Sequence, residues 1–385
     1  MKQTDSSAYE RLCTRMAELF VERFSSIADG NCRSIIEFSY PQQNMDGTVF
    51  GGSNSLMTSM IAAGHGYGIP VWFTMNRANE IGVSIKPGEH SVPIINYNTS
   101  FYEKESGKRV PDMTQDSYDG LSDEEKNKYE KRRYLRYYPE FNICQTNFSE
   151  VYPEEHARLV EFFGYDQRTK ADFALLDKVV KENGWACPIE VTKEVGEAVY
   201  HEGSDRIRVP LKSMFVDEHD YYNSLLHAMA LSTGSEMRLD RASSRKAFID
   251  SLPGAMGSQC AEALICELAA ATAGAAVGFS PELSDSSARF LKSWIGYIQA
   301  EPSLIYSMVT EASRSADMIL EGIGFKRGKG LNLTEVMSGV EKAVEARKKV
   351  QEKKSAGKVA SQKIRRWKGV KTSSSARKIK GSKSI

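Results

Sequence analysis

Residues Tyr221 to Arg241, with the sequence YYNSLLHAMALSTGSEMRLDR, predict a helix followed by a turn. Four apolar side chains recur at the i, i+3, i+4 and i+7 spacing of one helical face. They are Tyr222, Leu225, Leu226 and Met229. His227 and Leu231 lie four residues apart and therefore share a second face of the same helix. The first face predicts a contact with the hydrophobic core, and the second face is the candidate position for metal-binding or catalytic side chains.

The second face matches the spacing of a known metal motif. In zinc proteases with an HExxH motif, two histidines four residues apart bind the metal, and the glutamate after the first is the general base. Here the window is His227-Ala228-Met229-Ala230-Leu231, so the first histidine is present, and the base and the second histidine are not. The stretch is therefore either a ruined zinc site or an ordinary helix with one histidine.

Charge is distributed unevenly along the chain, although its net value is only +1. From Glu341 to Ile385 there are 16 Lys and Arg against 3 Glu, a net charge of +13. Residues 1–340 hold the remaining 35 Lys and Arg and 47 Asp and Glu, a net charge of −12. An acidic body with a basic tail indicates a tail that binds polyanions.

The six cysteines are scattered, and none forms a CxxC pair. A reduced, cytoplasmic compartment is the simplest interpretation. The N-terminal residues lack the apolar segment of a secretory signal, and no run of about 18 apolar residues predicts a membrane span. We therefore expect a cytoplasmic protein without a membrane partner.

Local patterns predict a mixed α+β chain. Helices are expected over residues 5–28, 53–64, 75–81, 154–163, 170–183, 259–277, 286–300 and 302–322. Strands are expected over residues 71–74, 91–96, 134–148, 188–191 and the hairpin 198–209. Residues 103–135 are interpreted as a charged insertion between two strands, helical over 122–136. Residues 322–331 are rich in glycine and basic side chains and are interpreted as a linker, and the chain beyond Lys354 as disordered.

A basic and aromatic cluster lies at the end of this insertion, at Arg132, Arg133, Tyr134, Arg136, Tyr137 and Tyr138. Such side chains can stack on bases and contact phosphates. Alternatively, the cluster is a solvated helix that runs into a sheet edge. Composition alone favours the second interpretation.

Spaced motifs in both halves show a family resemblance. The N-terminal ones are Pro41, Asn44, Gly47, Phe50, Gly52 and Asn54, then Trp72-Phe73-Thr74, Lys86-Pro87-Gly88-Glu89 and Phe141-Asn142. The C-terminal ones are Tyr200, Asp205-Arg206-Ile207, Tyr221-Tyr222, His227, Thr233-Gly234, Arg238-Leu239-Asp240-Arg241, Glu262 and Glu267. In order and spacing they resemble the ArdC-like antirestriction family of plasmids and other mobile elements, which is related to TraC-type plasmid primases.

The resemblance implies an N-terminal single-stranded-DNA-binding domain and a C-terminal zincin-like metallopeptidase domain. We place the first at residues 1–155, the second at 156–325, and a linker and basic tail at 326–385. The implied partner is single-stranded DNA, and another protein of the mobile element or of its host is a further candidate.

The N-terminal domain lacks two arginines of the family pattern. Thr48 and Gly51 stand where the TGRxYRGIN pattern has arginines, which weakens phosphate binding at that loop. The basic tail or other residues would then supply the contacts. The predicted nucleic-acid-binding residues are Asn44, Phe50, Asn54, Trp72, Arg77, Lys86, Arg132, Arg133, Arg136, Tyr137, Lys363, Arg365, Arg366 and Trp367.

The zincin-like domain departs further. A catalytic zinc takes three protein ligands, and the family supplies two histidines and a glutamate. Only His227 and one glutamate, for which Glu267 is favoured over Glu262, remain here. Ala228 cannot accept a proton from a bound water. His219, Cys260 or Cys266 would have to replace a ligand, and none would replace the base. We predict no metal, no cofactor and no catalytic residue, with Glu267 paired to His227 or Arg238.

Three functions remain open. The first is a single-stranded-DNA-binding protein of a mobile element that carries an inactive zincin-like domain. The second is a divergent zinc metallopeptidase with substitute ligands. The third is a structural or interaction protein that binds nucleic acid only through its basic tail.

Overall fold

The computed structural model describes residues 6–30, 34–37, 40–164, 173–241, 258–326, 328 and 330–333. The predicted tail contacts Lys363, Arg365, Arg366 and Trp367, and the expected disorder beyond Lys354, lie outside these residues. The described part mixes helices with two separate sheets, which confirms the α+β prediction.

The N-terminal part begins with a long helix and builds a five-stranded sheet. Its elements are α1 (Ser6–Ala28), β1 (Gln43–Asn44), α2 (Gly52–His65), β2 (Val71–Thr74), α3 (Met75–Ile81), β3 (Val92–Glu103), β4 (Arg109–Val110), α4 (Gln115–Asp119), α5 (Asp123–Lys126), β5 (Tyr129–Asn142), α6 (Phe148–Val151) and α7 (Pro153–Gly164). The strand order is β1-β2-β5-β3-β4, with β1 parallel to β2 and the other pairs antiparallel.

The C-terminal part builds a three-stranded sheet on a group of helices. Its elements are α8 (Ala174–Glu182), β6 (Ile189–Thr192), β7 (Val199–His201), β8 (Arg206–Pro210), α9 (Glu218–Ser232), α11 (Ser258–Val277), α12 (Asp285–Ala300) and α13 (Ser303–Gly322). The strand order is β6-β8-β7, with β6 parallel and β7 antiparallel to β8. The predicted hairpin and the helix that follows it are confirmed.

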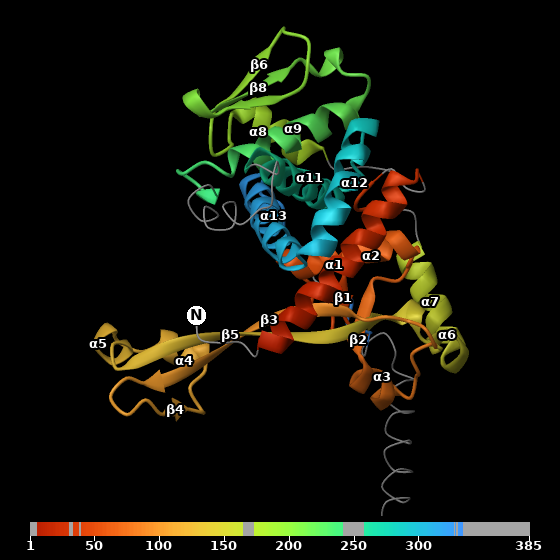
Figure 1. The fold of residues 1–385 in the computed structure, drawn as a ribbon, viewed down its shortest axis with the longest axis vertical. Helices are drawn as coiled ribbons and strands as arrows, with labels where there is room; N and C mark the ends of the chain where they lie inside the picture. The colour runs from red at the N-terminus through yellow and green to blue at the C-terminus, as the bar shows by residue number, and fades with distance from the viewer. Residues whose placement is uncertain are drawn as a thin grey trace, which may run out of the picture.

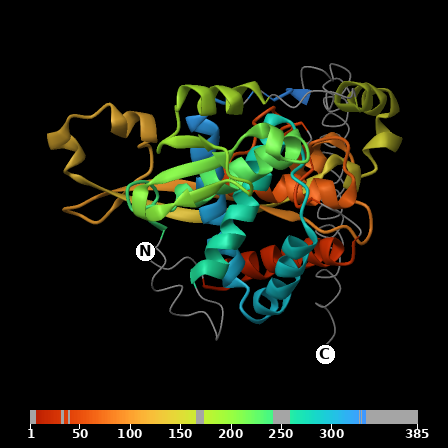
Figure 2. The ribbon, with the colours of Figure 1, turned by 90° about the horizontal axis from the view of Figure 1, so that it is seen from above.

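Strands β3 and β5 form a ribbon that leaves the rest of the molecule. They pair without interruption from Val92 with Glu140 to Glu103 with Tyr129. The ribbon projects to the left in Figure 1 and again in the view from above in Figure 2, with α4, α5 and β4 at its tip. The prediction of a helix over 122–136 was wrong. Ser122 does cap a helix through a capping box with Glu125, but α5 ends at Lys126, and pairing with β3 makes the following residues a strand.

The two halves share one core. Buried side chains of α1 and α2, such as Phe20 and Leu56, cluster with those of α11, α12 and α13, such as Trp294 and Met308. Figure 1 shows α1 beside α12 and α13. The proposed boundary at residue 155 falls within α7, whose Leu159 and Phe163 pack in a cluster with β2.

Among the described residues, one helix has the length and apolar composition of a membrane span, over Cys260–Val277 of α11, but 61% of that window is buried. It packs between α9 and α13, as expected for a core helix that is apolar all round.

The segment predicted to be a linker packs against the N-terminal sheet, because Leu331 and Leu333 hydrogen-bond to Gln43 and Met45 at β1.

Candidate functional site

Helix α9 is positioned by its cap and its apolar stripe. The Asp217 carboxylate accepts a hydrogen bond from the Asp220 amide at 2.9 Å, which satisfies a free amide of the first turn. Tyr222, Leu225, Leu226 and Met229 are all fully buried, as predicted. The opposite face of the helix therefore holds His227 at a fixed position.

His227 lies against Glu267 of α11. Its Nε2 is 3.1 Å from the Glu267 Oε2, while its Nδ1 is 2.9 Å from the carbonyl oxygen of Asn223. Among the described residues Nε2 has no aligned hydrogen-bond acceptor, so the contact is an ion pair by distance and charge. Ser287 of α12 donates a hydrogen bond to the other carboxylate oxygen at 2.9 Å. Three helices thus meet at Glu267.

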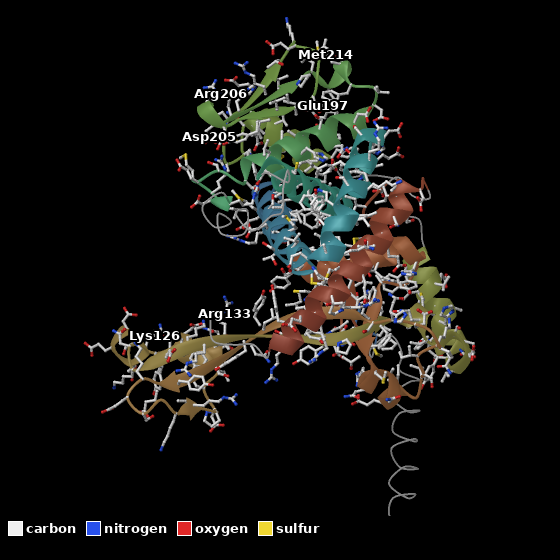
Figure 3. The ribbon with its side chains drawn as sticks, in the orientation of Figure 1. Lys126, Arg133, Glu197, Asp205, Arg206 and Met214 are labelled. Carbon is white, nitrogen blue, oxygen red and sulfur yellow. The ribbon has the colours of Figure 1, made fainter. Side chains whose placement is uncertain are left out.

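His227 and Glu267 each favour the charged form of the other at this buried position. Burial alone would lower the pKa of His227, but Glu267 outweighs it and the net pKa is raised. The Asn223 carbonyl and Glu197, labelled in Figure 3, act in the same direction. Burial alone would raise the pKa of Glu267, but His227 and Ser287 hold it below its ordinary value. The arrangement favours a protonated histidine beside a carboxylate.

The remaining donors do not complete a metal site. Leu231 and Ala228 have no donor atom, and the described residues contain no group of three His, Cys, Asp or Glu side chains that could hold a metal. His219 packs against the rings of Phe173 and Phe279, and Cys266 is buried in the core. Two ligands fall short of the three or four that zinc takes in proteins. The residues present do not fit a zinc ion.

The other charged residues of the C-terminal motif have structural partners. Arg241 is fully buried and its Nε donates to Glu262 Oε1 at 2.9 Å, with further bonds to Thr233 and to the Ala230 carbonyl. Arg238 pairs with Asp205 and donates to the Tyr200 hydroxyl at 3.0 Å. Of the two partners expected for Glu267, the structure provides His227 and not Arg238. The Arg241–Glu262 pair was not foreseen.

The ribbon is the second candidate site, and the structure divides its basic residues between two faces. Because side chains alternate along a strand, Arg132 and Arg136 lie on one face and Arg133 and Tyr137 on the other. The second face turns toward the helices: Tyr97 of that face hydrogen-bonds to Tyr306 of α13 at 3.0 Å, and Figure 3 shows Arg133 on that side.

The first face, which we call the outer face, is a row of polar, basic and aromatic side chains. It is formed by Asn96, Asn98, Ser100, Tyr102, Glu130, Arg132, Tyr134, Arg136 and Tyr138. Arg132 lies over the Tyr102 ring at 4.1 Å and pairs with Glu130. Tyr102 and Tyr134 share a hydrogen bond of 2.7 Å between their hydroxyls. Arg136 and Tyr138 are exposed.

Tyr102 lies outside the predicted cluster, and Tyr134 and Tyr138, although part of that cluster, were not among the predicted binding residues. The period-two pattern in residues 130–138, Glu-Lys-Arg-Arg-Tyr-Leu-Arg-Tyr-Tyr, would have grouped the two tyrosines of β5 with Arg132 and Arg136. The helix expected over residues 122–136 concealed this period-two pattern.

Several predicted binding residues of the N-terminal domain have structural roles instead. Trp72 is fully buried and donates to Gln42, and Phe50 is 8% exposed, so neither ring can stack on a base. Asn44 accepts bonds from the amides of Asp46 and Thr48 and shapes that turn. The Asn54 side chain bonds both backbone groups of Ile95 and completes the edge of β3. Burial of the Trp72 and Phe50 rings contradicts the prediction that they contact bases.

The remaining two cations, Arg77 and Lys86, make contacts outside the ribbon. Arg77 pairs with Glu80 at 2.9 Å and with Asp46 at 3.4 Å. Lys86 is exposed and donates to the Cys144 carbonyl. The structure therefore does not bring Arg77, Lys86 and the ribbon arginines together in one hydrogen-bonded group.

Comparison with known proteins agrees with this organisation. The model of the N-terminal domain of the anti-restriction factor ArdC matches residues 29–141, and that of a zincin-like metallopeptidase matches residues 177–311. The curated protein DNA primase TraC of Escherichia coli is 23% identical over 289 residues, which are 73% of this chain and 24% of TraC. The chain thus spans about a quarter of that relative.

Two solved structures of the antirestriction ArdC protein from the R388 plasmid share the fold. The metal-free form matches with a TM-score of 0.54 and 24% identity, over 81% of this chain and 99% of that one. The Mn(II)-bound form matches with a TM-score of 0.52 and 23% identity, over 82% and 97%. The chain thus combines a region that matches the ArdC N-terminal domain with a following zincin-like domain, in the fold of these structures, which supports the resemblance to the ArdC-like family.

Proposed function

We propose that this protein binds single-stranded DNA through the outer face of the β3–β5 ribbon, as an antirestriction-like protein of a mobile element. The alternation of arginine and tyrosine along β5 carries the proposal. The similarity to a DNA primase, TraC, and to a plasmid antirestriction protein, ArdC, is consistent with a role on DNA.

The geometry of the outer face suits a flexible nucleic-acid strand. Tyr134 and Tyr138 are four residues apart on one strand, which separates their rings by about 13 Å. Arg136 lies between them and makes no ion pair with any described residue. Stacking of a base on an aromatic side chain contributes about 1–3 kcal/mol, and a basic side chain beside the rings attracts the phosphate backbone of the strand.

The same face is a poor match for a duplex. The flat faces of bases are stacked inside a double helix, so the tyrosines have no surface to stack on. The outer face also has only two arginines, Arg132 and Arg136, and the first is paired with Glu130, so it provides little of the phosphate neutralisation that duplex binding requires. We therefore expect a preference for single strands and a strong dependence on salt.

The zincin-like domain is proposed to be catalytically inactive. Ala228 stands at the position of the general base and Leu231 at that of a ligand. Peptide hydrolysis that is lost on His227→Ala would contradict this part of the proposal.

A face-swap experiment tests the DNA-binding proposal. Labelled single-stranded and duplex oligonucleotides are titrated at several salt concentrations against two double variants, Arg132→Gln/Arg136→Gln and Lys131→Gln/Arg133→Gln. Both remove two positive charges from β5, but from opposite faces. We expect the first to weaken single-strand binding about tenfold at low salt and the second less than about twofold. Equal effects of the two variants would reject the outer face as the binding surface.

A further inference from the structure

The site at His227 is of interest because a metal-binding fold here holds a charged pair without a full set of ligands. An ArdC protein with the same fold has been solved with Mn(II) bound. In this chain two of the three positions of the ligand pattern remain, and their atoms lie 3.1 Å apart. We propose that this chain has converted the metal site into a side-chain ion pair, in which His227 of α9 and Glu267 of α11 hold each other and Ser287 of α12 completes the site.

The first argument is the need to compensate a buried carboxylate. The Glu267 side chain is 13% exposed, and leaving a buried carboxylate without a positive partner is costly. A metal ion would normally supply that charge in this fold. Here the positive partner in contact with Glu267 is His227, and Ser287 donates to the oxygen that His227 does not contact.

The second argument is the fixed orientation of the ring. The Asn223 carbonyl, one turn earlier on α9, lies 2.9 Å from Nδ1 and accepts a hydrogen bond from the Nδ1–H group. This contact holds Nε2 toward Glu267, as such backbone contacts hold the histidine ligands of metal sites. The supporting shell of a metal ligand has thus been kept, while Leu231 has removed the ligand on the next turn.

The third argument is the mechanical role of the pair. The His227–Glu267 contact joins α9 to α11, as a metal with ligands on these two helices would also do, and the hydrogen bond from Ser287 adds α12. The pair therefore stabilises the helix junction without a metal.

Restoring one ligand tests this conversion. Leu231→His places a second histidine on the face of His227, one turn further along α9. We expect this variant to bind one zinc or cobalt ion per chain and to gain about 3 °C or more in melting temperature with 100 μM zinc, because a ligand that binds only the folded state stabilises it. The wild-type protein and the control Met237→His, at a 76% exposed position, should show neither effect.

Two measurements guard against a misfolded variant. Metal content is determined for wild-type protein purified without chelators, and melting temperatures are compared for His227→Gln, Glu267→Gln and the double variant. We expect each single change to lower the melting temperature by about 4 °C, and the double change by clearly less than the sum. Stoichiometric zinc in the wild type that disappears with His227→Gln would overturn the proposal. So would additive effects of the two single changes, or a folded Leu231→His variant that binds no metal.

Discussion

Glu140 shows how one residue of β5 is governed by its neighbours in the sheet. It pairs with Val92 of β3 on one side and with Thr74 of β2 on the other. Burial raises its pKa to about 7, and its Oε2 has no hydrogen-bond partner among the described residues. The folded state therefore favours the protonated form of this side chain.

This shift predicts a pH-dependent stability. Because the folded pKa lies above the unfolded value of about 4.3, the contribution of Glu140 is fully present below pH 4 and is lost as the pH rises through 7. Glu140→Gln should therefore raise the free energy of unfolding by up to about 3 kcal/mol at pH 8 and change it little at pH 4. Urea denaturation at both pH values measures this.

A matched control is Glu150→Gln, at an exposed position of α6. It should shift the free energy of unfolding by the same small amount at both pH values. An equal effect of Glu140→Gln at pH 4 and pH 8 would show that the carboxyl is not protonated in the folded protein.

Residue identities alone show that α9 lacks the general base and the second histidine of an HExxH motif. No packing can give Ala228 a base or Leu231 a ligand atom, so this part of the candidate site could be predicted from the sequence. The partner of Glu267 could not, because His227 and Arg238 were both within reach along α9 and its turn. The bond from Arg238 to Asp205, far away in sequence, decided between them.

At the scale of elements, the end of α9 depends on a buried arginine that passes beneath it. A Cβ atom on Gly234 would lie 2.5 Å from Nη2 of Arg241 and 2.9 Å from Oε1 of Glu262. Both of those atoms belong to the ion pair that joins this turn to α11. The glycine therefore gives room to the pair.

Gly234→Ala should lower the free energy of unfolding by about 1–3 kcal/mol, because the extra methyl group forces the ion pair apart. Gly296→Ala is the control, since a Cβ there meets open space on α12. It should instead raise the free energy of unfolding by about 0.5–1 kcal/mol, because alanine is a better helix former than glycine. Chemical denaturation of both variants measures the contrast, and a neutral Gly234→Ala would show that the pair can move without cost.

Helices and the ribbon differ in how much of them could be predicted. Helix α3 starts at the Thr74 cap and ends at Gly82, whose φ of 74° suits glycine, so both signals are local. The residues just before strand β5 have an equally good local signal for a helix, at Ser122, but the helix that starts there, α5, ends after one turn. Twelve residue pairs with β3, from a segment more than 25 residues away along the chain, determine the strand instead.

At the scale of the whole molecule, the acidic body and the basic tail are connected close to the N-terminal sheet. The backbone of Leu331 and Leu333 bonds to Gln43 and Met45, so the chain returns to the N-terminal sheet before the tail begins. A basic segment attached there raises the local concentration of cations near that sheet.

Deleting residues 341–385 removes a net charge of +13 and should weaken binding to both single-stranded and duplex DNA. We expect the loss to be larger for duplex DNA, because the outer face of the ribbon continues to bind single strands. Titrations of the full chain and the truncated chain at 50 and 200 mM salt measure this. A truncated protein that binds no single strands at low salt would place all nucleic-acid binding in the tail.

The sequence by itself determined the resemblance to the ArdC-like family, the α+β composition, the helix that carries His227, and the absence from that helix of the glutamate and second histidine of an HExxH motif. These depend on residue identity and on patterns that span a few turns. The tertiary structure alone decided that Trp72 and Phe50 are buried, that Arg132 and Arg133 face opposite ways, and that Glu267 pairs with His227. Each of these is set by contacts between segments far apart in the chain, and local patterns contain no information about which distant segment will be the neighbour.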